Sequence, residues 1–162
     1  MKAWIACFLM FICAAGNVFA ANLQLPIRIG EAESSVRQKL GVPDAVVPLR
    51  SRQLLRYPKQ GLAITIGKQS LVEAISVMHA NEFDVASYTG KIISDIDVNQ
   101  TIDQVIKRLG PPYTTTDDDE SKTYIWELGD IILRVEAWEA DYAAAGVTYP
   151  RGSIRRVEIL KK

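Results

Sequence analysis

The chain repeats one segment of its own sequence 69 residues further on, and this repeat constrains the fold more than any other feature. Residues 29–43 (IGEAESSVRQKLGVP) align with residues 98–112 (VNQTIDQVIKRLGPP), and both segments end in Val-x-x-x-Leu-Gly-x-Pro. A repeat of this kind indicates two copies of one supersecondary unit that pack against each other. We therefore expect a domain built from two similar halves.

The second copy has the pattern of a short amphipathic helix. Its apolar residues recur three and four positions apart, on one helical face: Ile102, Val105, Ile106 and Leu109. Thr101 and Gln104 have the spacing of a capping box, and Gly110 suits the residue that ends a helix. The first copy ends in the same way at Gly41. Because helices of about ten residues are not stable alone, we expect each helix to pack on a sheet.

Alternating apolar residues follow each helix and predict strands. The first half has three such segments, at residues 55–57, 62–66 and 71–78, and the second half has counterparts at residues 124–126, 131–135 and 154–160. The shift between the halves is 69 residues for the first two segments and about 82 for the third. The second copy therefore carries an insertion near residues 141–152.

These elements predict an α+β fold with two tandem helix-plus-three-strand repeats. The repeats would share one antiparallel sheet and place both helices on one of its faces. The expected boundaries are residues 21–80 for the first repeat, 81–97 for a connector and 98–162 for the second repeat. Three strands and one short helix are marginal alone, so the two repeats are expected to form one combined domain.

Residues 1–20 have the features of a signal peptide. Lys2 is followed by an almost unbroken apolar run as far as Ala15, and Val18 and Ala20 precede the expected cleavage site. The apolar run is shorter than the roughly 20 residues that span a bilayer, so no stable transmembrane insertion is expected. The predicted location after cleavage near Ala20 is the bacterial periplasm or the outside of the cell.

Both cysteines of the chain, Cys7 and Cys13, lie in this export segment. A mature chain that starts at Ala21 would therefore have neither a disulfide nor a cysteine ligand for a metal. Cys13 follows residues 10–12 (MFI) rather than small residues, which disfavours a lipid anchor of the bacterial lipoprotein type.

The segment from Asn99 to Pro112, followed by an aromatic strand at residues 124–126, resembles the small envelope domains of the BamE (SmpA/OmlA) family. The duplicated helix-plus-sheet plan resembles the beta-lactamase inhibitor protein (BLIP-like) fold. These resemblances imply a non-catalytic protein-binding module of the cell envelope. The chain departs from the usual pattern of both families, because it has two copies of the motif and a mature chain without cysteine.

The chain offers little material for catalysis. His79 is its only histidine, and neither a glycine-rich phosphate loop nor a Gly-x-Ser-x-Gly elbow occurs. The acidic run Asp117, Asp118, Asp119 and Glu120 could supply oxygen ligands for calcium, but it lacks the spacing of an EF-hand loop. A solvated loop is the favoured interpretation of this run. We expect no cofactor and no metal, and we predict that the protein is not an enzyme.

The charges argue against nucleic-acid binding and point instead to a protein partner. The chain has 19 Lys and Arg against 19 Asp and Glu, without the basic excess that a phosphate backbone requires. The charges are unevenly placed, with Arg52 and Arg56 in a basic stretch of the first half and Asp117 to Asp119 in the acidic run of the second. Because such asymmetry can orient a charged protein, these residues are candidate binding residues.

The strand near residues 131–138 predicts a second candidate surface, on the side of the sheet that faces away from the helices. Its candidate binding residues are Ile132, Arg134, Glu136 and Trp138, with Arg156 beside them on the last strand. An exposed Trp close to Arg is typical of the centre of an interface. Trp138 could equally pack beneath the inserted segment, whose Tyr142 and Tyr149 are further candidates.

Together these features predict an exported, non-catalytic module that binds another envelope or secreted protein. The preferred form is an inhibitor or immunity-type protein that blocks a secreted or periplasmic enzyme. An outer-membrane assembly or envelope-maintenance role similar to that of BamE is one alternative, and an unrecognised enzyme is another.

Overall fold

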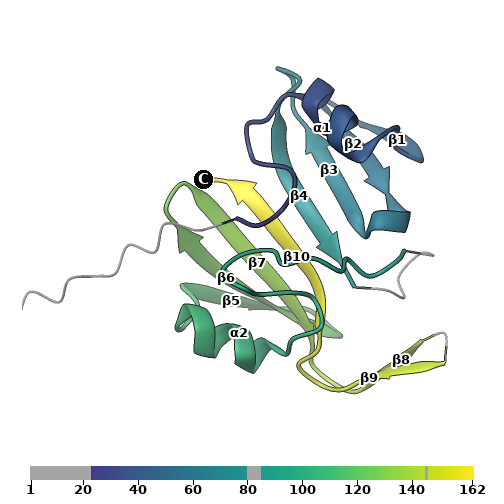
Figure 1. Ribbon diagram of the computed structural model, residues 1–162. Helices are drawn as coiled ribbons and strands as arrows, with labels where there is room; N and C mark the ends of the chain where they lie inside the picture. Colours follow the sequence, from purple (N-terminus) through teal and green to yellow (C-terminus); the bar gives the residue numbers. More distant parts are fainter. Residues whose placement is uncertain (1–22, 80–84, 145) are drawn as a thin grey trace, which may run out of the picture.

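The computed structural model describes residues 23–79, 85–144 and 146–162. The first half contains α1 (Glu33–Leu40), β1 (Ala45–Leu49), β2 (Arg52–Tyr57), the 3-10 turn η1 (Pro58–Gln60), β3 (Leu62–Ile66) and β4 (Val72–Met78) (Figure 1). The second half contains α2 (Ile102–Leu109), β5 (Thr114–Asp117), β6 (Ser121–Leu128), β7 (Ile131–Trp138), β8 (Tyr142–Ala144), β9 (Val147–Tyr149) and β10 (Ile154–Lys161). Within these described ranges, no helix is long and apolar enough to cross a membrane.

Eight strands form one antiparallel sheet in the order β1-β2-β3-β4-β10-β7-β6-β5. The last strands of the two halves, β4 and β10, pair in the middle, where Ser76 lies opposite Glu158. The two remaining strands, β8 and β9, form a separate hairpin that projects from the sheet between β7 and β10 (Figure 1). Each half therefore contributes four strands to a continuous sheet, and each half ends the sheet with its first strand.

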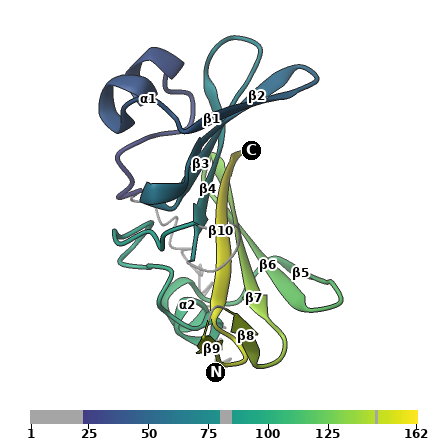
Figure 2. The ribbon, with the colours of Figure 1, turned by 90° about the vertical axis from the view of Figure 1, so that its right-hand side faces the viewer.

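Both helices lie on the same side of the sheet, as Figure 2 shows. The other side carries neither of these two helices, and we call it the open face. The strands alternate accordingly: in β7, Leu133 and Val135 are buried toward the helices, whereas Arg134 is exposed on the open face. The open face is therefore a surface of side chains from consecutive strands.

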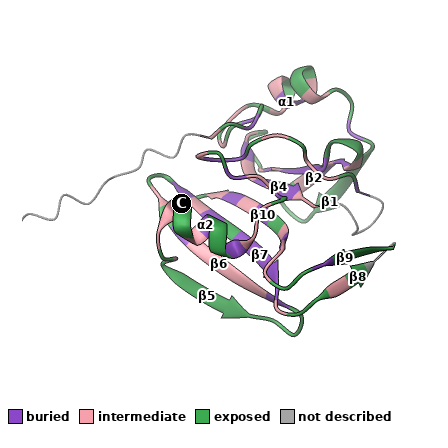
Figure 3. Ribbon diagram, turned by 60° about the horizontal axis from the view of Figure 1, so that its bottom comes forward, coloured by how far each residue is buried: buried purple, intermediate pink, exposed green. Residues whose placement is uncertain are grey.

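The expected α+β fold of two tandem helix-plus-three-strand repeats is wrong, because the molecule is mainly β with eight strands in its large sheet. The strands that the sequence did not indicate are β1 and β5, one in each half. Both lie at an edge of the sheet and are exposed along their whole length, and Figure 3 shows this for β5. An edge strand with no buried side has no need of apolar alternation, so no periodicity marked these two strands.

The residues that end the two helices have the geometry expected of glycine. Gly41 and Gly110 have positive φ angles of 85° and 83°, a region that other residues rarely adopt. At the other end of α2, the backbone N–H of Thr101 donates a hydrogen bond of 2.9 Å to Gln104 Oε1, which is one half of a capping box. The sequence predictions of these local features are confirmed.

An aromatic side chain of the sheet holds each helix end in place. The hydroxyl of Tyr57 on β2 donates to the carbonyl oxygen of Gly41 at 3.3 Å. The indole N–H of Trp126 on β6 donates to the carbonyl oxygen of Gly110 at 3.0 Å. Tyr57 and Trp126 lie 69 residues apart in the chain, and so do Gly41 and Gly110, so the two halves anchor their helices by the same contact.

The start of each helix is also tied to the sheet in the same way. The backbone N–H of Glu33 donates to the carbonyl of Ser70, just before β4, at 2.9 Å. The backbone N–H of Ile102 donates to the carbonyl of Gly152, just before β10, at 2.8 Å. The contacts of the two halves therefore correspond even where the inserted β8–β9 hairpin interrupts the sequence alignment.

The core lies between the sheet and the layer that contains the helices. Each helix is only eight residues long, and the helices contribute just three buried side chains in the described structure, Val36, Ile102 and Val105. Irregular segments before each helix supply the rest of this layer with Leu25, Ile27, Ile92, Ile93, Ile96 and Val98. The described part of the expected connector, residues 85–97, is therefore a component of the core.

The predicted signal peptide and both cysteines, Cys7 and Cys13, lie outside the described residues. Export and signal cleavage stay predictions of the sequence.

Candidate functional site

The open face holds half of the side chains that the sequence singled out. The strand register places alternate residues of β2, β7 and β10 on this face. The candidate residues found there are Arg52, Arg56, Ile132, Arg134, Glu136 and Arg156. The remaining candidates lie on the β8–β9 hairpin, beneath it, or at the end of β5.

Glu136 lies at the centre of a network that joins three strands of the open face. Its Oε1 accepts a hydrogen bond from the hydroxyl of Ser121 on β6 and another from Arg155 Nη1 on β10, both at 2.9 Å. Its Oε2 contacts Arg156 Nη2 at 2.9 Å. Burial of a carboxylate is costly unless it is paired, and Glu136 is 9% exposed with both oxygens paired. This network links β6, β7 and β10 through side chains, so both carboxylate oxygens of Glu136 are already occupied and are not available to a partner.

Weaker ion pairs extend this network across the open face. Glu158 lies 3.9 Å from Arg134 Nη1 and 3.6 Å from Arg156 Nε. Exposed pairs of this kind contribute at most about 1 kcal/mol. The arginines can therefore exchange these contacts for a carboxylate of a bound protein at little cost.

Trp138 is not an exposed residue of the open face. It is 6% exposed, its ring stacks on Tyr142 with 3.9 Å between ring centroids, and the guanidinium of Arg155 lies 4.5 Å from its ring. The expectation of an exposed Trp ringed by Arg is therefore corrected. Of the two interpretations of Trp138 from the sequence, the structure shows packing beneath the inserted segment.

The β8–β9 hairpin is held on the sheet by its two tyrosines. Tyr142 covers Trp138, and Tyr149 contacts the ring of His79 edge to face, with centroids 5.1 Å apart. Tyr149 is buried, and this burial raises the pKa of its hydroxyl. Both tyrosines are therefore structural contacts, and His79 belongs to the same cluster.

The acidic run forms the β5–β6 turn at the edge of the sheet. Asp117 pairs with Lys122 at 2.9 Å, and its hydrogen bond raises the pKa of Lys122. The backbone N–H of Asp118 donates to the carbonyl of Ser121, and that of Asp119 donates to Asp118 Oδ1. No group of three or more possible metal ligands occurs among the described residues, and the run has the geometry of an exposed turn.

The basic and acidic candidates do not form one site. Arg52 begins β2 next to one edge of the sheet, whereas Asp117 ends β5 at the opposite edge. Arg134 and Arg156 lie between them on β7 and β10. The charge asymmetry of the sequence is thus spread over the full width of the sheet.

The sequence analysis missed an apolar surface at the β1 edge. Val46 is 46% exposed, Val47 is 36% exposed and Leu49 is 42% exposed. The signal for it was present in the short apolar run AVVPL between Asp44 and Arg50. Such a run is ambiguous from sequence alone, because a buried strand has the same composition.

No protein-family model matches the chain, and no curated protein matches its sequence. Its fold, a mainly β domain with one large antiparallel sheet, is similar to a solved structure, that of a DUF4309 family protein (YjgB) from Bacillus subtilis subsp. subtilis str. 168. The similarity covers 82% of this chain and 79% of that chain, with a TM-score of 0.52 and 13% sequence identity. At this identity the comparison shows a shared fold alone.

The resemblance to the BamE family and to the BLIP-like fold is wrong. The similar structure is a DUF4309 protein, and the sheet has eight strands rather than two sets of three. The Leu-Gly-x-Pro motif reports how a short helix ends, which is a local property shared by many unrelated helices. The motif therefore predicts where the two helices end but does not identify a protein family.

Proposed function

We propose that the protein is an exported, non-catalytic binding module that holds an extended segment of another protein alongside β1. The observation that carries this proposal is the uncovered apolar edge of the sheet. β1 pairs with β2 alone among the described strands, and three of its five side chains are exposed large apolar groups: Val46, Val47 and Leu49.

An edge strand of this kind is suited to the addition of another strand. Its outward backbone N–H and C=O groups lack a neighbouring strand and can pair with an extended peptide. Val47 lies opposite Leu54 on the open face, so an added segment with an apolar residue there would extend this contact. Pro48 has no N–H to donate, which limits the hydrogen-bonded match to a short segment.

The charges at the two ends of β1 suggest what the added segment carries. Asp44 precedes the strand and Arg50 follows it. Asp44 lies 3.7 Å from Lys59, whereas Arg50 forms no ion pair with any residue that the structure describes. An acidic side chain at one end of the partner segment would pair with Arg50 in a way that this chain does not supply.

The form of this function that we propose is inhibition of, or immunity to, a secreted or periplasmic enzyme. A partner that adds a strand at β1 would lie next to the open face, which carries Arg52 and Arg56 on the neighbouring strand β2. Inhibition by this route needs no catalytic group in the inhibitor, because steric cover of the target is sufficient.

Site-specific cross-linking tests this function. A photoreactive amino acid is placed at position 47 of β1, and in a matched control at position 116 of β5, and each protein is exposed to the periplasmic and secreted proteins of the native host. We expect position 47, and not position 116, to cross-link one other protein, and the cross-linked peptide to come from an extended apolar segment of that protein. The purified partner should then bind the chain at a ratio of one to one, and an enzyme should lose activity.

Two results would overturn the proposal. Equal cross-linking at positions 47 and 116 would show that β1 has no special role. A cross-link from position 47 to a second copy alone would show that the apolar edge serves self-association.

A further inference from the structure

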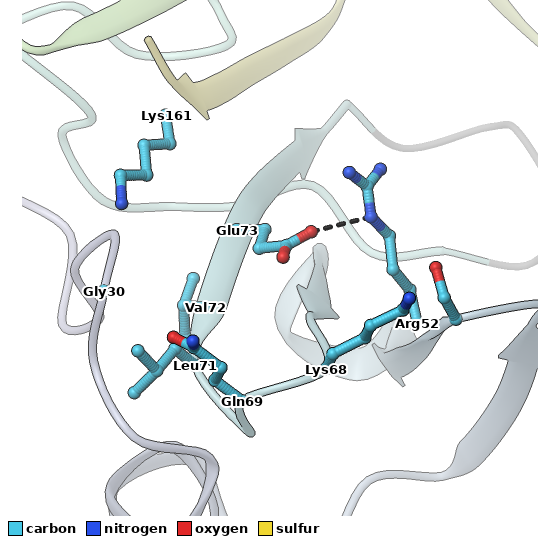
Figure 4. Close-up of a pocket in the computed structure, with 9 residues that line it drawn as sticks. Gly30, Arg52, Lys68, Gln69, Leu71, Val72, Glu73 and Lys161 are labelled. Atoms are coloured by element: carbon cyan, nitrogen blue, oxygen red, sulfur yellow. Dashed lines mark ion pairs between the residues drawn. The ribbon is translucent and has the colours of Figure 1, made fainter.

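A cavity of about 440 Å³ lies at the end of the sheet where β10 ends, between the β1–β2 turn and the β3–β4 turn (Figure 4). Its charged lining residues come from four parts of the chain: Arg52 at the start of β2, Lys68 in the β3–β4 turn, Glu73 in β4 and Lys161 at the end of β10. The sequence analysis did not identify this group, because its members, such as Arg52 and Lys161, are far apart in the chain. The fold brings three cations and one carboxylate to one cavity.

Only one of the three cations is neutralised. Arg52 Nε lies 2.6 Å from Glu73 Oε2, which is the ion pair drawn in Figure 4. Lys68 and Lys161 form no ion pair with any residue that the structure describes. The four charged groups therefore leave two positive charges without a matching carboxylate around the cavity.

The position of Glu73 is built into the fold. A Cβ atom at Gly67 would overlap the Glu73 carboxylate, so the absence of a side chain at Gly67 leaves the space that Glu73 occupies. Figure 4 shows the Glu73 carboxylate between Arg52 and Lys161. The ion pair with Glu73 holds the Arg52 guanidinium at the edge of the cavity. The two terminal nitrogens of Arg52 make no hydrogen bond to any described residue.

We propose that this cavity binds a phosphate group carried by a small molecule or a lipid headgroup. A phosphate monoester has a charge of about −1.5 to −2 at pH 7 and three strong acceptor oxygens, so its charge balances the two positive charges that the lining leaves without a carboxylate. One water molecule in the liquid occupies about 30 Å³, so a cavity of about 440 Å³ has room for a phosphate group, which has five heavy atoms, and for the molecule that carries it. Leu71 and Val72 supply an apolar wall for the organic part of the ligand.

This site adjoins the β1 edge, because Arg52 lies opposite Leu49, but its ligand is recognised by charge and does not depend on the protein partner proposed above. Its chemistry also predicts a pH dependence. Because the second ionisation of a phosphate monoester falls near pH 6, binding should be tighter at pH 7.5 than at pH 5.5.

The test is a titration of the mature chain, residues 21–162, with inorganic phosphate and separately with acetate, followed by amide chemical shifts and by calorimetry. We expect phosphate to shift the resonances of residues 67–73 and 161, and acetate to bind more weakly. Lys68→Gln and Lys161→Gln should each weaken phosphate binding about tenfold, the usual effect of losing one charged hydrogen bond. Lys107→Gln, on the exposed side of α2, is the matched control and should leave binding unchanged.

Vesicles separate the two sources of the phosphate group. Phosphatidylcholine vesicles with and without phosphatidic acid are sedimented with the chain and with the two lysine variants. Sedimentation that requires phosphatidic acid and both lysines supports a lipid headgroup, and phosphate binding without sedimentation supports a soluble phosphomonoester. No shift at the cavity in phosphate, or equal binding by Lys68→Gln, Lys161→Gln and Lys107→Gln, would overturn the site.

Discussion

The two hairpins at the edges of the sheet, β1–β2 and β5–β6, occupy equivalent places in the two halves and have opposite surface chemistry. β1 is apolar and its turn begins with Arg50, whereas β5 consists of three threonines and Asp117 and leads into an acidic turn. Inside the molecule the two hairpins are alike, because Tyr57 and Trp126 hold the helix ends by the same contact. The buried contacts are therefore the same in the two halves, whereas the exposed edges differ.

This divergence has a physical basis. An exposed, uncharged apolar edge strand invites pairing with other chains, and proteins usually protect such an edge with charge or proline. The β5 edge carries Asp117 and a following acidic turn, whereas β1 has Pro48 as the residue that interrupts backbone donors. One edge is thus protected by charge and the other is left available over a short length.

The largest expected effect comes from the shared interior of the two hairpins. Trp126→Ala and Tyr57→Ala should each lower the free energy of unfolding by about 3–5 kcal/mol, the usual loss for a buried aromatic residue. Urea denaturation followed by circular dichroism measures this loss. Since β4 and β10 join the halves in one sheet, each variant should unfold in a single transition, and two separate transitions would show that the halves are independent.

A smaller loss is expected at the matched valines of the helices. Val36 in α1 and Val105 in α2 are both fully buried. Substitution of either by Ala removes buried apolar surface and should lower the free energy of unfolding by about 1–2 kcal/mol. Thermal melting compares the two variants, and an unchanged melting temperature for only one of them would show that its helix packs loosely.

The edges themselves should differ in binding rather than in stability. Val47→Lys places a charge on the β1 edge and should weaken binding of the proposed protein partner at least tenfold, because the charged lysine would be buried beside the added strand. Thr116→Lys on β5 is the matched control and should leave the affinity unchanged. Calorimetry with the purified partner gives both affinities, and equal losses in the two variants would remove the contrast between the edges.

The smallest expected effect is a pH dependence of stability, which comes from one carboxyl group just before the helix in each half. Burial alone would raise the pKa of Glu31, but hydrogen bonds from Lys39 and Ser35 hold it below its usual range. Burial would also raise the pKa of Asp97, but the hydrogen bonds from Lys91 and Asn99 lower it in the same way.

A carboxyl whose pKa is lowered by folding stabilises the fold fully above its unfolded pKa, and that contribution is lost as the pH falls from the unfolded pKa through the lower folded pKa. Glu31→Gln and Asp97→Asn should therefore each reduce stability at pH 7 by about 0.5–1 kcal/mol and have a smaller effect at pH 3. Denaturation at the two pH values measures this difference. A loss that is equal at both pH values would show that the substituted amide disturbs packing instead.

Local features were accessible from the sequence because they depend on neighbouring residues. The ends of both helices followed from Gly41 and Gly110, whose positive φ angles suit a residue without a side chain. The strands β6 and β7 followed from a period of two, since one side of each strand is buried.

Features without a buried periodic side were not accessible. β1 and β5 are exposed edges, so neither has the alternation that marks a half-buried strand, and the apolar run of β1 was ambiguous by itself. A Trp close to Arg is typical of an interface, and only the path of the β8–β9 hairpin showed that Tyr142 covers Trp138.

The internal repeat, the helix ends and the alternating strands follow from the amino-acid sequence, because they depend on short-range steric and hydrophobic rules. The tertiary fold was needed to show which strand is an exposed edge and which irregular segments, such as the one containing Ile92 and Ile93, complete the core. It also decided that Arg52, Lys68 and Lys161 line one cavity. These outcomes depend on contacts between residues far apart in the chain, and no local pattern encodes them.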